Sequence, residues 1–133
     1  MREIKEENMM TECELLVMKA IWSTDEIMSI KGIQALVNEA YNKDWKIQTV
    51  STFLARLVKK EYLRMERRGR SFFYYPLVKE EDYGKMEIVK CVDMWGKGKI
   101  QALLSAFSEV RGLTKEDKKS IREIIENGDS KVD

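Results

Sequence analysis

The stretch Gln48-Thr49-Val50-Ser51-Thr52-Phe53-Leu54-Ala55-Arg56-Leu57-Val58-Lys59-Lys60-Glu61 decides the fold that we predict for this chain. Its apolar residues recur at the spacing of one helix face, namely Val50, Phe53, Leu54, Leu57 and Val58. The other face carries short hydrogen-bonding side chains near its start and basic ones near its end. Because Ser and Thr form helices less readily than Glu and Lys, helix propensity does not account for this polar face.

The polar face suits the base edges of a DNA major groove, which Gln, Ser and Thr reach with hydrogen-bond donors and acceptors. The alternative is a solvent-facing helix whose Ser and Thr residues cap its start. We predict that Arg56 and Lys59 reach flanking phosphates, although Arg56 has an internal ion pair as an alternative. The predicted DNA-contacting residues of this helix are Gln48, Thr49, Ser51, Thr52, Arg56 and Lys59.

Two further helices are predicted before this stretch. The first starts at Thr11, which forms a capping box with Glu14, and stops near the turn formers of residues 23–25. The second follows Ser29, carries an apolar stripe and closes at residues 42–44. A short polar turn then leads into the third helix, which is helix-turn-helix order. Residues 1–10 are expected to form a frayed leader.

Directly after the third helix, the apolar period changes from that of a helix to that of a strand. Residues 63–68 alternate, residues 69–71 form a turn, and the aromatic run of residues 72–75 has high strand propensity. The predicted hairpin tip is basic and fits a sugar-phosphate backbone; its proposed contacts are Arg67, Arg68, Arg70 and Ser71. The alternative, a solubilising turn, does not explain why a basic hairpin follows a weakly polar helix.

Three helices followed by such a hairpin predict a winged helix-turn-helix domain over residues 10–78, in a mostly α protein with a small β-hairpin wing. Residues 79–127 are expected to form a helical region in which residues 96–98 separate two helices and Thr114 caps a third. Residues 128–133 are expected to be disordered.

Three short helices are too small to bury their apolar faces alone, so they need a partner surface. That surface is the winged domain of the same chain or a second copy of this chain. We favour the homodimer, because DNA-reading proteins commonly dimerise to match a palindromic site. The predicted dimerisation residues are Tyr83, Met86, Val89, Trp95, Leu103, Leu104, Phe107, Ile121, Ile124 and Ile125.

Composition weakens several other classes of function. The chain has 133 residues and a formal net charge of +1, so any basic patch must be local. It contains no histidine, which removes imidazole-based catalysis and imidazole zinc sites, and we predict neither an enzyme nor a cofactor or metal site. Cys13 and Cys91 lie in helical apolar contexts and are expected to be packed, reduced thiols rather than a disulfide or metal pair.

The sequence also predicts a cytoplasmic protein with no membrane partner. No apolar run approaches the roughly 20 residues that cross a bilayer. The first seven residues, Met1-Arg2-Glu3-Ile4-Lys5-Glu6-Glu7, are too charged for a signal peptide.

The chain resembles the penicillinase-repressor family of bacterial transcription repressors, the BlaI/MecI type. The resemblance covers about residues 10–126, and its matching segments are residues 14–22, 49–61 and 72–76. It implies an N-terminal winged helix, a C-terminal helical dimerisation region and repression by occupying a palindromic operator in double-stranded DNA. The copper-responsive branch of the family carries a C-terminal cysteine cluster, which residues 126–133 lack.

Family members that control β-lactam resistance leave the operator when a sensor-linked protease cuts the dimerisation region. The family's cleavage bond is typically Asn-Phe, and the aligned bond here is Ala106–Phe107. The sequence therefore predicts a homodimeric DNA-binding repressor, in a β-lactam-resistance type of circuit if the protease acts on it. The alternative is a winged-helix protein-interaction module without specific DNA binding, which would not need the arginine-rich hairpin tip.

Overall fold

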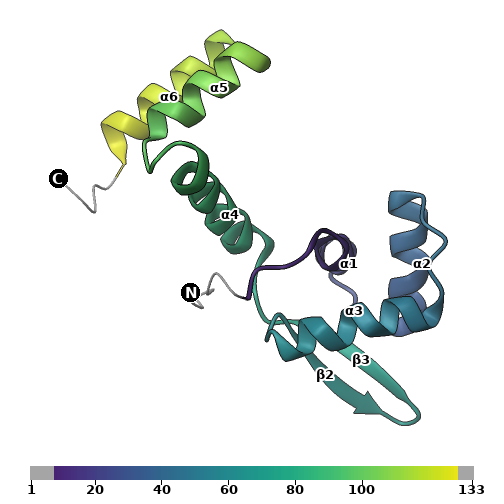
Figure 1. Cartoon of the computed structure of the whole chain (residues 1–133). Coiled ribbons are helices and arrows are strands. Elements are labelled where there is room, and N and C mark those ends of the chain that lie inside the picture. Colours follow the sequence, from purple (N-terminus) through teal and green to yellow (C-terminus); the bar gives the residue numbers. More distant parts are fainter. Residues whose placement is uncertain (1–7, 129–133) are drawn as a thin grey trace. The chain divides into compact units, whose positions relative to one another are not determined.

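The computed structural model describes residues 8–128, which form helices and one small antiparallel sheet (Figure 1). Residues 1–7 and 129–133 lie outside this description, and with them most of the predicted leader and tail. The elements in chain order are α1 (Glu12–Trp22), β1 (Met28–Ser29), α2 (Ile30–Tyr41), α3 (Ile47–Lys59), β2 (Leu63–Arg68), β3 (Ser71–Pro76), α4 (Glu80–Trp95), α5 (Ile100–Val110) and α6 (Lys115–Asn127).

The chain divides into two compact units, Met1–Met86 and Glu87–Asp133. Helix α4 begins in the first unit and ends in the second. The functional boundary predicted at residue 79 stays a prediction, but the compact first unit extends through the first two turns of α4.

The core of the first unit lies between α1, α2, α3 and the sheet. The predicted inner stripe of α3 is confirmed, since Val50, Leu54 and Leu57 are fully buried. Helices α1, α2 and α4, strands β2 and β3 and the adjoining loops contribute to the same core, whose further members are Val17, Met18, Ala20, Ile21, Ile33, Val37, Tyr62, Leu63, Tyr74, Val78 and Tyr83. This packing leaves the opposite face of α3 outside the core.

The predicted hairpin is confirmed as β2 and β3, which pair antiparallel from Leu63–Pro76 to Arg68–Ser71. The sequence did not predict β1, whose two residues pair with Tyr74 and Phe73 and give the strand order β1-β3-β2. Two residues are too short to show a strand period, and their pairing depends on the three-dimensional position of β3.

Residues 8–10 are not frayed, contrary to the predicted leader. The Tyr62 hydroxyl donates to the Asn8 carbonyl at 2.7 Å, and the Met10 N–H donates to the Tyr83 hydroxyl at 2.8 Å. Met9 and Met10 also pack partly buried against the core. Long-range contacts of this kind leave no signal in the charged sequence around them.

The second unit consists of the later part of α4 with α5 and α6. Gly96 ends α4 where α5 approaches closely, because a Cβ at Gly96 would lie 2.8 Å from the Ala102 Cβ. The capping box of α6 is confirmed, with the Thr114 side chain accepting from the Asp117 N–H at 3.0 Å. The expectation of two packed thiols is wrong for Cys91, which is exposed, whereas Cys13 is half-buried, and both are free.

No helix within residues 8–128 is long and apolar enough to cross a bilayer.

Candidate nucleic-acid interface

The outer face of α3 is open to solvent over its whole length. Five of the six predicted contact residues are exposed and Thr49 is half-buried, so no described part of the first unit covers this face. The Thr52 hydroxyl donates to the Gln48 carbonyl at 3.0 Å, which ties one polar side chain of the face to the helix itself. The oxygen of Thr52 still has lone pairs that can accept a hydrogen bond from outside.

The start of α3 is electrostatically positive. Its N-cap is Lys46, which makes no side-chain capping bond, and its first turn contains no acidic residue. The unpaired N–H groups of that turn therefore add to the charge of exposed Lys43 and Lys46. The last turn carries Arg56 and Lys59, so the face is flanked by cations at both ends.

Arg56 does not form, with any residue that the structure describes, the internal ion pair that the sequence left open as an alternative. No ion pair joins it to another residue within 8–128, and its guanidinium carbon lies 6.0 Å from the centre of the Phe53 ring. The guanidinium therefore stays exposed on the same side as the polar face.

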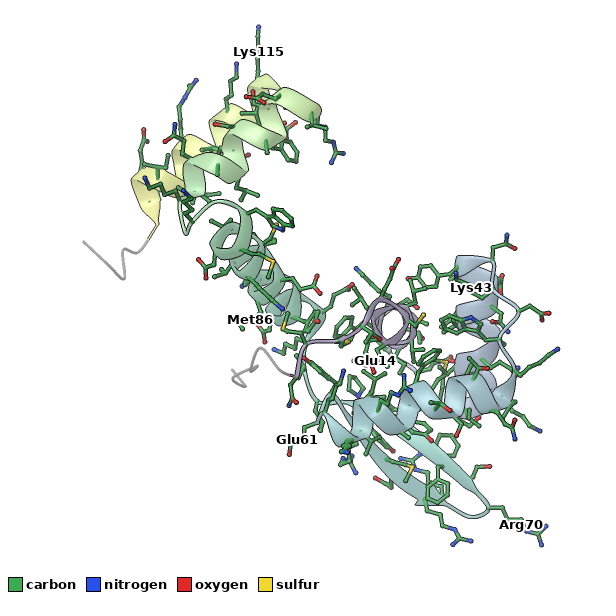
Figure 2. The ribbon with its side chains drawn as sticks, in the orientation of Figure 1. Glu14, Lys43, Glu61, Arg70, Met86 and Lys115 are labelled. Carbon is green, nitrogen blue, oxygen red and sulfur yellow. The ribbon has the colours of Figure 1, made fainter. Side chains whose placement is uncertain are left out.

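The hairpin of β2 and β3 leaves the end of α3 and projects away from the three helices, with its turn at the free end (Figure 1). Gly69 has a φ of 63° in this turn, a left-handed conformation that glycine adopts without strain. The Arg67 Nε donates to the Gly69 carbonyl at 3.0 Å, and Arg70 lies at the very tip (Figure 2).

The arginines of the hairpin differ in what holds them. Arg64 and Arg68 both pair with Glu66, at 2.8 Å and 3.5 Å, and Arg68 also donates to the Tyr75 hydroxyl. The hydrogen bond from Arg64 is the main reason that the pKa of Glu66 lies below its ordinary value. Arg70 makes no hydrogen bond or ion pair with any residue that the structure describes, so it is the arginine most available to an external anion.

One ion pair behind α3 was not predicted. The Lys60 ammonium lies 2.6 Å from the carboxylate of Glu14, whose side chain is 1% exposed. Burial alone would raise the pKa of Glu14. Hydrogen bonds from Lys60 and from the Thr11 N–H outweigh this effect, so the pKa lies below its ordinary value. The capping-box pattern predicted Glu14 correctly, but no local pattern links it to a lysine 46 positions away. Lys60 is therefore directed into the unit and is not part of the basic face.

The predicted dimerisation residues fall into two groups. Tyr83 is 2% exposed in the first unit, packed against Trp22 and Tyr62, and Met86 is partly buried against the same core. The rest lie in the second unit, where Val89, Trp95, Phe107, Ile124 and Ile125 are exposed and Leu103, Leu104 and Ile121 are half-buried. Tyr83 is thus occupied within its own chain.

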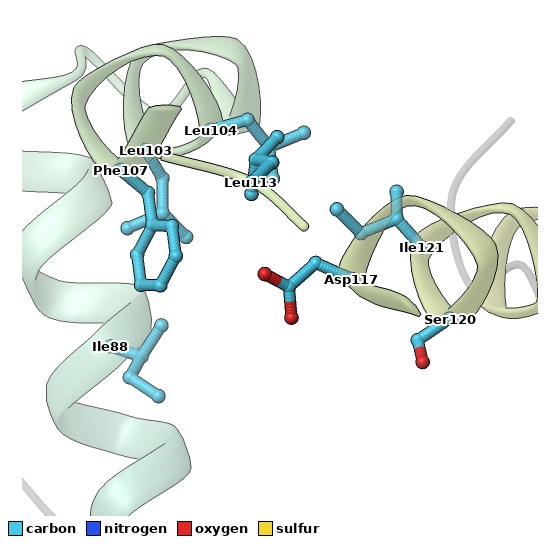
Figure 3. A pocket seen from close by; sticks show the side chains of 8 residues that line it. All are labelled: Ile88, Leu103, Leu104, Phe107, Leu113, Asp117, Ser120 and Ile121. Carbon is cyan, nitrogen blue, oxygen red and sulfur yellow. The ribbon is translucent and has the colours of Figure 1, made fainter. Parts of the chain in front are cut away.

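The second unit holds an apolar groove of about 480 Å³ (Figure 3). Its lining residues are Ile88, Leu103, Leu104, Phe107, Leu113, Asp117, Ser120 and Ile121. The hydrogen bond from the Thr114 backbone is the main reason that the pKa of Asp117 lies below its ordinary value, so the groove's one carboxyl stays charged at neutral pH. Among residues 8–128 there is no cluster of three or more potential metal ligands.

The sequence profile that describes the penicillinase repressor matches residues 10–127 of this chain. The penicillinase repressor of Bacillus licheniformis is 29% identical over 116 residues, which cover 87% of this chain and 88% of that protein. The methicillin resistance regulatory protein MecI of Staphylococcus aureus (strain N315) is 26% identical over 115 residues, which cover 86% of this chain and 91% of that protein. The solution structure of the DNA-binding domain of the repressor BlaI is also similar, with 31% sequence identity and a TM-score of 0.49. The match covers 62% of this chain and 94% of that domain.

The match to the family profile spans nearly the whole chain and includes both the winged unit and the helices that follow it. This chain therefore belongs to the penicillinase repressor family.

Proposed function

We propose that this protein is a sequence-specific DNA-binding transcriptional repressor that acts as a homodimer on a palindromic operator. The proposal rests on one observation above all: the polar face of α3 and the arginine tip of the hairpin are both exposed in the same compact unit. Membership of the family supports it, because penicillinase repressors are DNA-binding regulators and not enzymes.

The two surfaces would divide the work of recognition. The side chains of Gln48, Ser51 and Thr52, with Thr49 beside them, would read base edges in the major groove. The cations at both ends of α3 and at the hairpin tip would contact phosphates, which position the protein without reading sequence. The net charge of +1 means that attraction to DNA comes from this local arrangement and not from the whole molecule.

The second unit supplies the argument for a homodimer. It leaves large apolar side chains in water, including Trp95 at 80%, Val110 at 89% and Ile125 at 74% exposure, and none of the residues of α5 or α6 is buried. A soluble unit of this size does not normally keep such a surface uncovered. In a two-fold dimer, each copy would cover the same patch of the other.

A two-fold dimer also explains the expected operator. Two winged units related by a two-fold axis would meet two half-sites related by the same symmetry, so the operator would be palindromic. Repression would follow because a bound dimer competes with RNA polymerase for the promoter.

Release by a sensor-linked protease would require access to the Ala106–Phe107 bond. Ala106 and Phe107 are exposed, but they lie in the middle of α5. A protease binds its substrate in an extended form, so cleavage would require α5 to unwind locally. Together with the change from Asn to Ala before the bond, this places a larger barrier before cleavage than an exposed loop would.

The experiment that tests the proposed function is a titration of the full chain with labelled duplexes at two salt concentrations. One duplex is selected from a random pool by the protein, and the other has a scrambled sequence. We expect tighter binding to the selected duplex and a steep loss of affinity with salt. Equal binding to both duplexes with little salt dependence would instead indicate a protein-interaction module.

A further inference from the structure

The turn between α2 and α3 is held by side chains of α2. The Asn38 Oδ1 accepts a hydrogen bond from the Trp45 N–H at 3.0 Å, and its Nδ2 donates to the Trp45 carbonyl at 3.1 Å. The Gln34 Nε2 donates to the same carbonyl at 3.0 Å. Both backbone polar groups of Trp45 are thus bonded to α2.

Trp45 also contacts α3 through its side chain. Its indole ring lies 5.1 Å from the ring of Phe53, centre to centre, and the Lys43 ammonium lies 5.9 Å from the indole centre. Phe53 is half-buried on α3, so Trp45 is fixed to α2 by its backbone and to α3 by its ring.

The start of α3 depends on this connection because the helix lacks a cap of its own. The N-cap Thr11 of α1 and the N-cap Thr114 of α6 each form a complete capping box, whereas the side chain of the N-cap Lys46 makes no capping hydrogen bond to α3. Trp45 immediately precedes Lys46, and Gln48 follows two residues later. The contacts of Asn38 therefore hold the segment that leads directly into the proposed base-reading residues.

We propose that Asn38 is a positioning residue that sets the base preference of α3, with Gln34 supporting it. The proposal rests on the proposed function. Hydrogen bonds to base edges need a closely defined position of the helix start, whereas contacts of long, flexible cations with phosphates tolerate small displacements. Loss of the Asn38 contacts should therefore reduce discrimination between sequences far more than it reduces binding to any duplex.

The test compares the full-length wild type with Asn38→Ala, Asn38→Asp and Gln34→Ala on the selected and scrambled duplexes. For Asn38→Ala, we expect affinity for the selected duplex to fall by about tenfold or more, since two hydrogen bonds are lost. Affinity for the scrambled duplex and the salt slope should stay unchanged. Asn38→Asp keeps the acceptor for the Trp45 N–H but places a carboxylate against the Trp45 carbonyl. Its discrimination between the two duplexes should therefore lie between that of wild type and that of Asn38→Ala.

Glu39→Ala is the matched control, because Glu39 is the exposed neighbour of Asn38 on the same helix. It should leave both affinities unchanged. Hydrogen exchange on the free proteins gives a second measurement: Asn38→Ala should speed exchange at residues 45–49 and leave residues 54–58 protected.

An equal loss of affinity for both duplexes in Asn38→Ala would overturn the proposal. The proposal would also fail if Asn38→Ala distinguished the two duplexes as well as wild type does. If Asn38→Ala does not fold, Asn38→Asp and Gln34→Ala are judged by the same criteria. A wild type that binds the two duplexes equally would overturn the proposed function itself, whereas discrimination that survives the variants would overturn only the role of Asn38.

Discussion

At the scale of single residues, the arginines of the hairpin tip are chemically alike but differ in how strongly the chain holds them. Arg68 is paired with Glu66 and bonded to Tyr75, so contact with phosphate would first break internal interactions. Arg70 has no such partner among the described residues. From the sequence, Arg68 and Arg70 are equally good candidates for a phosphate contact. Only the side-chain contacts in the structure distinguish them.

We predict that Arg70→Ala weakens binding to selected and scrambled duplexes alike and reduces the slope of log affinity against log salt by about 0.9 for each bound copy of the chain, or about 1.8 for the proposed dimer. Arg68→Ala should reduce the slope less, because its charge is already partly compensated by Glu66. Fluorescence anisotropy at four or more salt concentrations measures both. Lys115→Ala, which removes the same charge from the exposed start of α6, is the control. A slope that is unchanged in Arg70→Ala would remove the hairpin tip from the DNA contact.

The buried Glu14 predicts a dependence of stability on pH. Its pKa in the folded chain lies below the ordinary value of 4.5, so the charged form stabilises the fold. This contribution is complete above about pH 4.5 and is lost as the pH falls through the lower folded pKa. Glu14→Gln should lower the free energy of unfolding at pH 7 by about 2 kcal/mol, because it leaves Lys60 without its carboxylate.

Urea unfolding between pH 3 and pH 7 checks this prediction. The loss of stability on acidification should be shallower in Glu14→Gln than in wild type. Glu66→Gln is the matched control, since Glu66 is also ion-paired but stands exposed on the hairpin, where such pairs contribute little. Parallel acid profiles for wild type and Glu14→Gln would show that another group controls the acid transition.

At the scale of elements, the sequence predicts what depends on local pattern. The apolar stripe of α3, the capping boxes at Thr11 and Thr114, and the hairpin turn at Gly69 all follow from neighbouring residues, and each is present in the structure. The pairing of β1, the Lys60–Glu14 ion pair and the Asn38–Trp45 contacts could not be predicted. Each of these joins side chains or strands whose proximity exists only after the helices have packed.

Helix α3 carries a prediction that separates base reading from general affinity. Thr52→Val keeps the shape of the side chain but removes the hydroxyl. In the wild-type chain this hydroxyl donates to the Gln48 carbonyl. If Thr52 reads a base, the variant should lose about 1–3 kcal/mol of discrimination at one base pair. Selection from a random duplex pool with wild type and variant would show the change as a relaxed position in the preferred sequence. An identical preferred sequence would exclude Thr52 from base reading.

At the scale of the whole molecule, the position of Tyr83 determines where the winged unit can be cut. The residue is 2% exposed, its ring packs against Tyr62 with centres 5.5 Å apart, and its hydroxyl accepts from the Met10 N–H. The predicted boundary at residue 79 would remove this side chain from the core.

We therefore predict that a fragment of residues 1–86 is more stable than a fragment of residues 1–78 by about 3–5 kcal/mol, the usual effect of losing a large buried aromatic side chain. Urea unfolding followed by circular dichroism compares the two. A 1–86 fragment carrying Tyr83→Ala should behave like the shorter fragment. Equal stability of the two fragments would show that α4 adds nothing to the first unit.

The proposed homodimer makes a prediction about α6. Ile124→Asp and Ile125→Asp together place two charges on an exposed apolar face and should weaken association by about 2 kcal/mol or more. Sedimentation of the full chain at several concentrations measures the change. Asn127→Asp adds a charge at an exposed polar position of the same helix and should leave association intact. A double variant that sediments like wild type would exclude this face from the dimer.

The strand order β1-β3-β2 leaves one side of β2 without a neighbouring strand. Four of the six residues of this strand are charged: Arg64, Glu66, Arg67 and Arg68. An unpaired strand rich in apolar residues invites other chains to extend the sheet, which leads to aggregation, and charged side chains along the strand oppose this. Arg67 and Arg68, which we predict to contact nucleic acid, should therefore also oppose the addition of another chain at this edge of the sheet.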